Sequence, residues 1–296
     1  MDDGSNAECR IKGNFRIRGI RSTNPVAVGD FVEVQTLADG TNWITEIEER
    51  RNYIIRKSTN LSKESHILAA NIDQVALIVT VNHPVTSTTF IDRFLATCEA
   101  YRVRAILIFN KIDLLTDEEN EQVEELRALY ESIGYEAIEI SAISLQNTEY
   151  RAQNTDLLTL FASKTTLLSG NSGVGKSTLL NALFGKEMTR TGKISDAHDK
   201  GMHTTTFSEM YFLDDGRIID TPGIKGFGTI DFEREEVGHY FRDIFRVSRD
   251  CRFGNCTHTN EPGCAVKEAV VRGEIAVSRY ESYLSLLGDC EEGKYR

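Results

Sequence analysis

Hydrophobic and polar positions follow two different patterns along this chain of 296 residues, and the pattern changes near residue 70. Before that point, residues 31–34 (FVEV) and 43–49 (WITEIEE) alternate apolar and polar positions, with turn residues between them. Alternation of period two predicts half-buried strands. A further strand is expected at 53–58, and the set predicts a small barrel of the OB or SH3 type. No strand precedes the turn-like residues 2–4, so we expect the barrel to lack its first strand.

After residue 70, continuous apolar runs alternate with stretches of helical spacing. An unbroken apolar run predicts a strand buried on both faces, and strands that alternate with helices predict a mostly parallel sheet. We expect strands at 75–81, 104–110, 136–142 and 165–170, helices at 91–101, 118–133, 156–162 and 176–185, and a hairpin of strands at 207–213 and 216–223.

The remainder of the chain contains a long polar loop and a helical tail. Residues 186–206 are polar and aperiodic, and loops of that length inside a domain are usually functional or disordered. The tail from residue 237 is expected to be helical. It includes residues 278–288, whose apolar stripe we interpret as packing. We therefore predict three domains, at 1–60, 61–235 and 236–296.

The strongest chemical signal is GNSGVGKS at residues 170–177, between an apolar strand and an amphipathic helix. This context indicates a phosphate-binding loop. Glycines let backbone N–H groups face the phosphates, Lys176 neutralises β and γ oxygens, and the Ser177 hydroxyl ligates Mg²⁺. The nucleotide-binding residues expected here are Gly170, Asn171, Ser172, Gly173, Val174, Gly175, Lys176, Ser177 and Thr178.

Two further motifs point to GTP. In DTPG (220–223), Asp220 can hold Mg²⁺ through water and Gly223 can offer its N–H to the γ-phosphate. In NKID (110–113), the Asp113 carboxylate can accept two hydrogen bonds from guanine, whereas adenine has no donor at either place.

NKID also ends a buried strand, where open α/β sheets bind ligands. There, Asn110 can bond the base and brace the phosphate loop, and the Lys111 stem can lie on the ring. Ser141 and Ala142 end the next strand and suit a second loop that contacts the base.

A cluster of three cysteines and a histidine predicts a metal site. Cys251, Cys256, His258 and Cys264 supply three thiolates and an imidazole, a set suited to closed, tetrahedral, structural Zn²⁺. The other three cysteines are isolated, and we interpret them as ordinary thiols.

The order base loop, SA loop, phosphate loop, DTPG is a circular permutation of the Ras-like order. With an OB-fold before it and a cysteine cluster after it, the chain resembles the RsgA/YjeQ family of bacterial ribosome-assembly GTPases over almost its whole length. The resemblance implies that GMHTTT (201–206) is switch I, that Thr205 is a Mg²⁺ ligand, and that His203 acts in hydrolysis. Thr204 and Thr206 are alternative registers for the Mg²⁺ ligand. Independently, Ile224 cannot orient a water as a Gln would, which makes His203 the best local candidate.

The distribution of charge along the chain is compatible with binding to RNA and also with no such binding. The net charge of -11 lies within residues 61–244, and the flanks 1–60 and 245–296 are each neutral. The N-terminal flank could present a local basic face or a solvated surface of mixed charge. The candidates for such a face are Arg16, Arg18, Arg21, Arg50, Arg51, Arg56 and Lys57.

These patterns predict a multidomain chain with an N-terminal β-barrel, a central α/β GTPase domain of permuted motif order, and a helical zinc-binding region. We expect Mg²⁺-dependent attack of water on the γ-phosphate of GTP, one structural Zn²⁺ per chain, and a monomer in the cytoplasm without a membrane partner. The resemblance implies binding to the 30S subunit, 16S rRNA and other assembly factors, with hydrolysis stimulated by the subunit. A P-loop ATPase or kinase, and an RNA-binding module with negligible turnover, are the alternatives.

Overall fold

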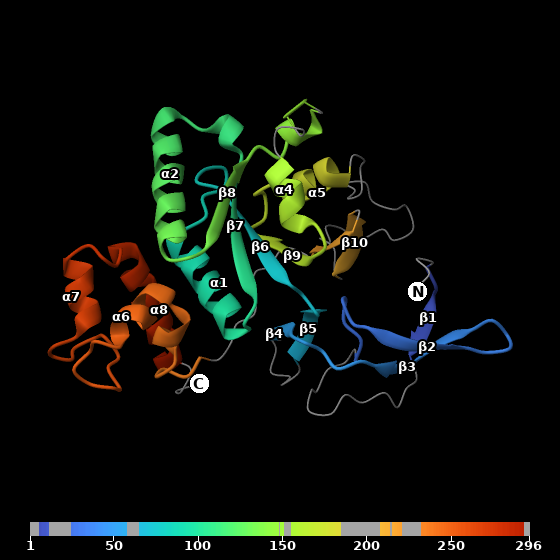
Figure 1. The fold of residues 1–296 in the computed structure, drawn as a ribbon, viewed down its shortest axis with the longest axis horizontal. Coiled ribbons are helices and arrows are strands. Elements are labelled where there is room, and N and C mark those ends of the chain that lie inside the picture. The colour runs from blue at the N-terminus through green and yellow to red at the C-terminus, as the bar shows by residue number, and fades with distance from the viewer. Residues whose placement is uncertain are drawn as a thin grey trace.

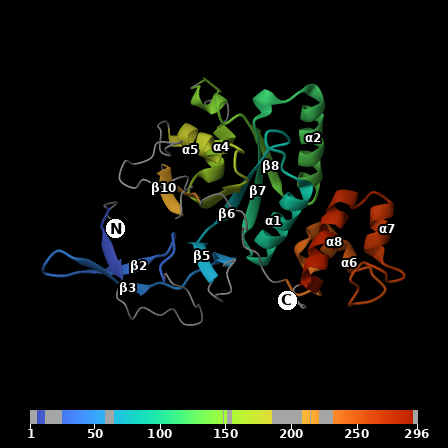
Figure 2. The ribbon, with the colours of Figure 1, turned by 180° about the vertical axis from the view of Figure 1, so that it is seen from behind.

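The chain forms three parts that follow one another along the sequence (Figure 1, and from behind in Figure 2). The computed structural model describes residues 6–11, 25–57, 65–147, 149–150, 155–184, 208–213, 215–220 and 232–292. The N-terminal strands and the C-terminal helices lie at opposite ends of the molecule, and the central sheet with its helices lies between them.

The N-terminal part is built from short strands. In the described residues, β1 (Cys9–Ile11), β3 (Asn42–Ile47) and β2 (Val32–Thr36) form a three-stranded sheet in that order. The strands predicted at 31–34 and 43–49 are confirmed. The strand predicted at 53–58 is also present, as β4 (Tyr53–Lys57), but it pairs with β5 (Ser65–Ala70) in a separate antiparallel sheet that leads into the central domain. Residues 12–24, where the rest of the predicted barrel falls, lie outside the described residues.

The central sheet has the order β10-β11-β9-β6-β7-β8 in the described residues. All neighbours pair in parallel except β10 and β11, so the carboxyl ends of five strands meet at one edge. This arrangement confirms the predicted α/β domain. Its strands are β6 (Gln74–Val79), β7 (Arg104–Asn110), β8 (Glu136–Ile140), β9 (Thr165–Gly170), β10 (Glu209–Leu213) and β11 (Gly216–Asp220).

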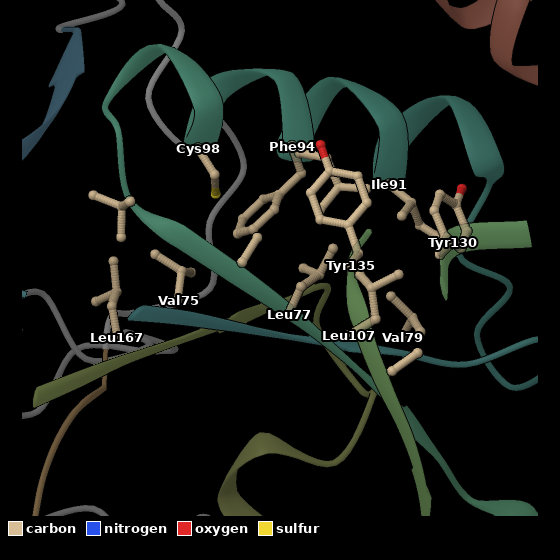
Figure 3. Close-up of a cluster of buried hydrophobic side chains, with 14 of the residues drawn as sticks. Val75, Leu77, Val79, Ile91, Phe94, Cys98, Leu107, Tyr130, Tyr135 and Leu167 are labelled. Carbon is tan, nitrogen blue, oxygen red and sulfur yellow. The ribbon is translucent and has the colours of Figure 1, made fainter. Parts of the chain in front are cut away.

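Helices cover both faces of this sheet, which explains its unbroken apolar runs. Alternate residues of β6 face opposite sides: Val75 and Leu77 pack towards α1 and α2, and Ala76 and Ile78 pack towards α4 and α5. Figure 3 shows the first of these two clusters, with Phe94 of α1 over the strands. The helices are α1 (Thr88–Ala100), α2 (Asp117–Ser132), α4 (Thr155–Phe161) and α5 (Lys176–Phe184).

The C-terminal part is helical, as predicted, and has its own apolar cluster. The stripe of residues 278–288 is packing: Tyr283 and Leu287 are buried, and Tyr280 and Leu284 pack against the same cluster. The elements are the 3-10 helix η3 (Val237–Tyr240), α6 (Arg242–Ser248), α7 (Ala265–Val271) and α8 (Val277–Glu292).

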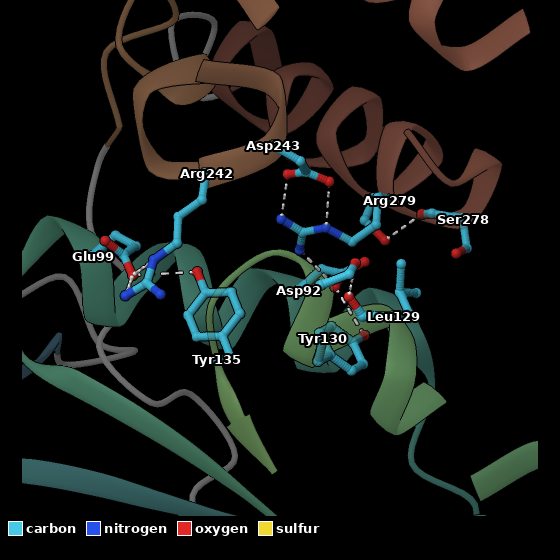
Figure 4. A network of polar contacts seen from close by, with 11 residues as sticks. Asp92, Glu99, Leu129, Tyr130, Tyr135, Arg242, Asp243, Ser278 and Arg279 are labelled. Carbon is cyan, nitrogen blue, oxygen red and sulfur yellow. Dashed lines mark hydrogen bonds and ion pairs between the residues drawn. The ribbon is translucent and has the colours of Figure 1, made fainter. Parts of the chain in front are cut away.

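Buried charges join this C-terminal part to the central domain (Figure 4). Arg279 of α8 is 1% exposed and donates to Asp92 of α1 and to both carboxylate oxygens of Asp243 in α6. The Tyr130 hydroxyl of α2 donates to the same oxygen of Asp92, at 2.9 Å. Arg242 adds a more exposed pair with Glu99. The network ties α8 and α6 to α1 and α2.

Two arginines of the candidate N-terminal basic face form ion pairs with carboxylates of the same chain. The Arg50 guanidinium is buried and pairs with Asp30 at 2.6 Å, and Arg51 pairs with Asp73 at 3.0 Å. The buried Arg50 pair stabilises the N-terminal part, and the charges of both arginines are compensated. Arg16, Arg18 and Arg21 lie outside the described residues. Within the described part of the chain, no helix combines the length and the apolar character needed to span a bilayer.

Candidate nucleotide-binding site and metal centre

The loop between β9 and α5 has a backbone that only glycine fits well. Gly170 has φ +144° and Gly175 has φ +102°. A Cβ on Gly170 would lie 2.5 Å from the Ile78 carbonyl oxygen, and one on Gly175 would lie 2.3 Å from the Asn110 Nδ2. Val174 is fully buried and anchors the loop in the core. The loop thus has the close-packed, strand-to-helix geometry of a phosphate-binding loop.

Lys176 begins α5, and its ammonium is held at the loop. Its Nζ donates to the carbonyl oxygens of Gly170 and Asn171, at 2.6 and 2.9 Å. Burial lowers the pKa of Lys176, and the nearby Asp220 carboxylate acts in the opposite direction. The structure therefore brings together the lysine and Asp220, the last residue of β11. Asn171, Ser172, Gly173, Ser177 and Thr178 lie in the same loop and the first turn of α5.

One amide joins three of the predicted loops. Asn110, at the end of β7, is 3% exposed. Its Nδ2 donates to the Val174 carbonyl of the phosphate loop, at 2.7 Å, and its Oδ1 accepts from the Ala142 N–H, at 2.9 Å. Segments far apart in the sequence therefore form a single cluster at the carboxyl edge of the sheet. The permuted chain order still brings the loops together in space.

Lys111 and Asp113 follow Asn110 in the NKID loop. Lys111 has φ +68° and its ammonium donates to the His83 carbonyl. Asp113 is exposed, in the short 3-10 helix η1 (Ile112–Leu114). The exposed carboxylate is free of the core and can meet a ligand at the edge of the sheet. The Ser141 hydroxyl bonds Ser144, at the start of the 3-10 helix η2 (Ser144–Gln146), which shapes the SA loop.

Sequence reasoning missed the loop after β6. Pro84 is the residue that a Cβ added to Gly173 would meet. The carbonyl oxygen of His83 accepts a hydrogen bond from the Lys111 ammonium, and the Asn82 amide donates to Glu119 at 2.9 Å. His83 therefore supports the base loop, Pro84 lies against the phosphate loop, and Asn82 contacts the first turn of α2. The one signal available in the sequence was their place at the carboxyl end of a buried strand. The predicted site residues His203, Thr205 and Gly223, with the alternatives Thr204 and Thr206, lie outside the described residues.

The cysteine cluster forms a compact donor set. The ligand atoms of Cys251, Cys256, His258 and Cys264 all lie within 4.8 Å of one another. His258 Nδ1 is 3.6 Å from the Cys251 sulfur and 3.5 Å from the Cys264 sulfur, and those sulfurs are 4.0 Å apart. With metal–ligand distances of about 2.3 Å for sulfur and about 2.05 Å for nitrogen, a tetrahedral Zn²⁺ requires separations of about 3.8 and 3.6 Å. The donor set fits zinc.

The surroundings of the cluster hold its backbone in place. The Glu261 carboxylate accepts from the Thr257 N–H and hydroxyl and from the Thr259 N–H. Burial acts to raise the pKa of Glu261, but these hydrogen bonds together outweigh it and lower the pKa to about 2. The hydroxyls of Tyr280 and Tyr283 donate to the carbonyls of His258 and Thr257. Burial lowers the pKa of His258, which favours the neutral imidazole that a metal needs.

The sequence and the fold are similar to those of known proteins. Residues 47–230 match the family described as RsgA GTPase, and residues 2–44 match the RsgA N-terminal domain. The chain is 60% identical to the small ribosomal subunit biogenesis GTPase RsgA 2 of Bacteroides thetaiotaomicron, over 100% of this chain and 94% of that protein. It is 58% identical to the small ribosomal subunit biogenesis GTPase RsgA of Phocaeicola vulgatus, with the same coverage.

Two solved structures share the fold. YjeQ from Thermotoga maritima superposes with a TM-score of 0.73 at 33% identity, over 95% of this chain and 89% of that one. YloQ, described as a circularly permuted GTPase, superposes with a TM-score of 0.71 at 32% identity, over 97% of this chain and 87% of that one. Both similarities extend over nearly all of the chain.

Proposed function

This chain belongs to the RsgA GTPase family and is a GTP-hydrolysing enzyme, and from that premise we propose that it acts in the biogenesis of the small ribosomal subunit. The observation that carries the site assignment is the Asn110 amide, which joins the phosphate loop to the base and SA loops. One bound nucleotide could touch all three loops, since all of them lie at one edge of the sheet.

The base is selected, in this proposal, by Asp113. An exposed carboxylate at this edge can accept from guanine N1–H and from the 2-amino group, and adenine would leave it unpaired. Lys111 lies beside it, with its stem available for the ring. Ser141 and Ala142 complete the base pocket through the loop that Asn110 holds.

The phosphates lie in the loop from Gly170 to Thr178, where backbone N–H groups and the Lys176 ammonium stabilise charge on the β and γ oxygens. GTPases of this family use Mg²⁺ with GTP, and the ion neutralises phosphate charge when it is bound. Ser177, Thr205 and, through water, Asp220 are the residues assigned to hold it. Gly223 is assigned to the γ-phosphate through its N–H.

The reaction is in-line attack of water on the γ-phosphate. We assign His203 to position this water, because Ile224 stands where an orienting Gln would otherwise be placed. No arginine finger is evident in the sequence, so slow unaided turnover is expected, with stimulation by the subunit. We further propose that the protein binds 16S rRNA as a cytoplasmic monomer, together with other assembly factors. The N-terminal strands and zinc-binding helices at its two ends would provide the contacts (Figure 1).

The test is GTP turnover by the purified protein with and without purified small ribosomal subunits. We expect stimulation by the subunits, and loss of both rates in Lys176→Ala. Equal rates with and without subunits, at concentrations where binding is demonstrated, would contradict stimulation and favour a binding module that uses nucleotide only as a switch.

A further inference from the structure

A hollow lies beside the metal loop, which we define as residues 251–264. Its volume is about 260 Å³, close to the lower end of the roughly 300–1,000 Å³ typical of ligand pockets. His239, Phe253 and Asn255 line it, and Cys256 and His258 form part of its wall. The residues that line the hollow belong to the C-terminal part of the chain. Figure 1 shows this part at the end of the molecule away from strands β1 to β3. The nucleotide site makes no use of it.

Two arginines lie against exposed aromatic rings at the hollow and beside it. The Arg252 guanidinium lies 5.5 Å from the centroid of the Phe253 ring, and that of Arg249 lies 5.4 Å from the Phe245 ring. The rings of His239 and Phe245 meet edge-on, with their centroids 5.1 Å apart. Because His239 lines the hollow, it connects the Arg249–Phe245 pair to it. All five side chains are exposed. Exposed aromatic rings beside arginines are the means by which proteins stack unpaired bases.

Positive charge on this surface is available for a partner. Arg246, Arg249 and Arg252 are exposed, and no ion pair to a carboxylate is found for any of them within the described residues. Asp250 lies between them in sequence, and the exposed Glu235 lines the hollow itself, where its carboxylate repels a phosphate. Arginines without carboxylate partners favour phosphates as the occupant, and they disfavour a basic protein surface.

The wall of the hollow selects the neutral part of a nucleotide. Three thiolates with one Zn²⁺ have a net charge of −1, so a phosphate would be repelled at this place. A planar neutral ring avoids that repulsion. The exposed Asn255 amide carries two donors and an acceptor for the edge of such a ring, and Phe253 offers a face for stacking.

We propose that the hollow takes an unpaired, unstacked nucleobase of an RNA strand whose phosphates lie on Arg246, Arg249 and Arg252. The inference deepens the proposed function and rests on it for the source of the RNA. It assigns stacking to Phe253, recognition of the base edge to Asn255, and sequence-independent attraction to the arginines. Binding by this surface therefore requires single-stranded RNA.

The test measures binding of the full-length protein to two probes: purified small ribosomal subunits and a fluorescein-labelled single-stranded RNA of about 12 nucleotides. Phe253→Ala is expected to weaken both interactions by about 5- to 150-fold, with the salt dependence unchanged. Phe253→Trp retains stacking and is expected to bind as the wild type does. Arg252→Ala is expected to weaken binding and to lower the slope against log salt by about one.

Matched controls lie elsewhere on the molecule. Phe212 of β10 is 66% exposed, and Phe212→Ala is expected to leave binding unchanged. Arg272 of the same C-terminal part pairs with Glu274, so Arg272→Ala controls for loss of charge alone. Zinc content and thermal unfolding of each variant show that the exposed substitutions leave the fold intact.

Each contrary result has a separate meaning. Equal binding by Phe253→Ala and Phe212→Ala to both probes would overturn the base site. Weaker binding of Phe253→Ala to subunits, with unchanged binding to the single-stranded RNA, would assign the surface to a ribosomal protein and also overturn the proposal. If the wild type fails to bind subunits, the proposed function fails, and the RNA probe still decides whether the hollow binds a base.

Discussion

Arg279 Nη1 lies 2.7 Å from Asp92 Oδ1, and the two side chains are 1% and 0% exposed. The same guanidinium donates to Asp243 at 2.8 and 3.1 Å, so one buried cation serves two buried carboxylates from different parts of the chain. A buried charge is tolerated only when it is paired and hydrogen-bonded. This relationship fixes the orientation of α6 and α8 against α1 (Figure 4).

Removal of Arg279 should therefore destabilise the protein strongly. Arg279→Met keeps much of the side-chain volume but leaves two buried carboxylates without their cation, and we expect the free energy of unfolding in urea to fall by about 3–5 kcal/mol. Arg242→Met at the same interface is the control: its pair with Glu99 is partly exposed, and we expect a loss of about 1 kcal/mol or less. Equal losses in the two variants would contradict the role of burial.

The destabilisation by Arg279→Met should also depend on pH. Burial raises the pKa of Asp92, and the charge of Arg279 opposes that rise. Without the arginine, the folded-state pKa of Asp92 rises further above its unfolded value, so protonation stabilises the variant at low pH and stability is lost as the pH rises through the folded pKa. Urea unfolding at about pH 5 and about pH 8 should show the smaller destabilisation at the lower pH.

The close approach of Gly175 to the Asn110 amide predicts that a larger residue at position 175 weakens nucleotide binding. In Gly175→Ala the new methyl meets the Asn110 amide, and the residue must also hold φ +102°. We expect guanine-nucleotide affinity, measured with a fluorescent GDP analogue, to fall by about 10- to 100-fold. Gly288→Ala is the matched control, since its Cβ would meet nothing within 4 Å. Unchanged affinity in Gly175→Ala would mean that the three loops are joined in some other way.

The proposed base contact predicts a change of specificity. Asp113→Asn replaces an acceptor by a donor, so the guanine amino group faces another amino group, whereas the 2-oxo group of xanthine becomes a partner. We expect GTP affinity to fall by roughly 100-fold and xanthosine triphosphate to become the better ligand. Competition between the two nucleotides measures this. A variant that binds both nucleotides as the wild type does would contradict the assignment of Asp113.

Local patterns predicted the parts of the fold that are determined locally. The burial of β6 on both faces was predicted by its unbroken apolar run, and the strand–glycine–lysine–helix order around Gly170 and Lys176 predicted the phosphate loop with its flanks. The order of the motifs predicted the circular permutation that the similarity to YloQ supports. These features depend on residues that are close in sequence.

The features that were missed depend on pairing between distant residues. Arg279 lies within an apolar helical stripe, and its partners Asp92 and Asp243 are 187 and 36 positions away. Neither carboxylate is distinguishable in sequence from a surface charge. The pairing of β4 with β5 was missed for the same reason, because the choice of a neighbour strand depends on the tertiary context.

The switch I assignment predicts a defect in turnover without a defect in binding. If His203 positions the attacking water, His203→Ala should lower subunit-stimulated kcat by about 100-fold and leave GTP affinity unchanged, because the water is oriented in the transition state and the ground-state nucleotide contacts remain. His66→Ala is a control histidine outside the motif. A rise in KM with unchanged kcat would instead indicate a role for His203 in nucleotide binding.

The metal loop predicts that zinc stabilises the C-terminal part. Cys256→Ser removes one of three thiolates from the donor set, and we expect zinc content measured by atomic emission to fall from about one per chain. Thermal stability should fall with it, because metal binding contributes free energy to folding. Cys290→Ser, a half-buried cysteine of α8 outside the set, is expected to keep its zinc. If both variants retained one zinc per chain, the ion would be bound elsewhere, and His258 and the three cysteines would have no role in holding it.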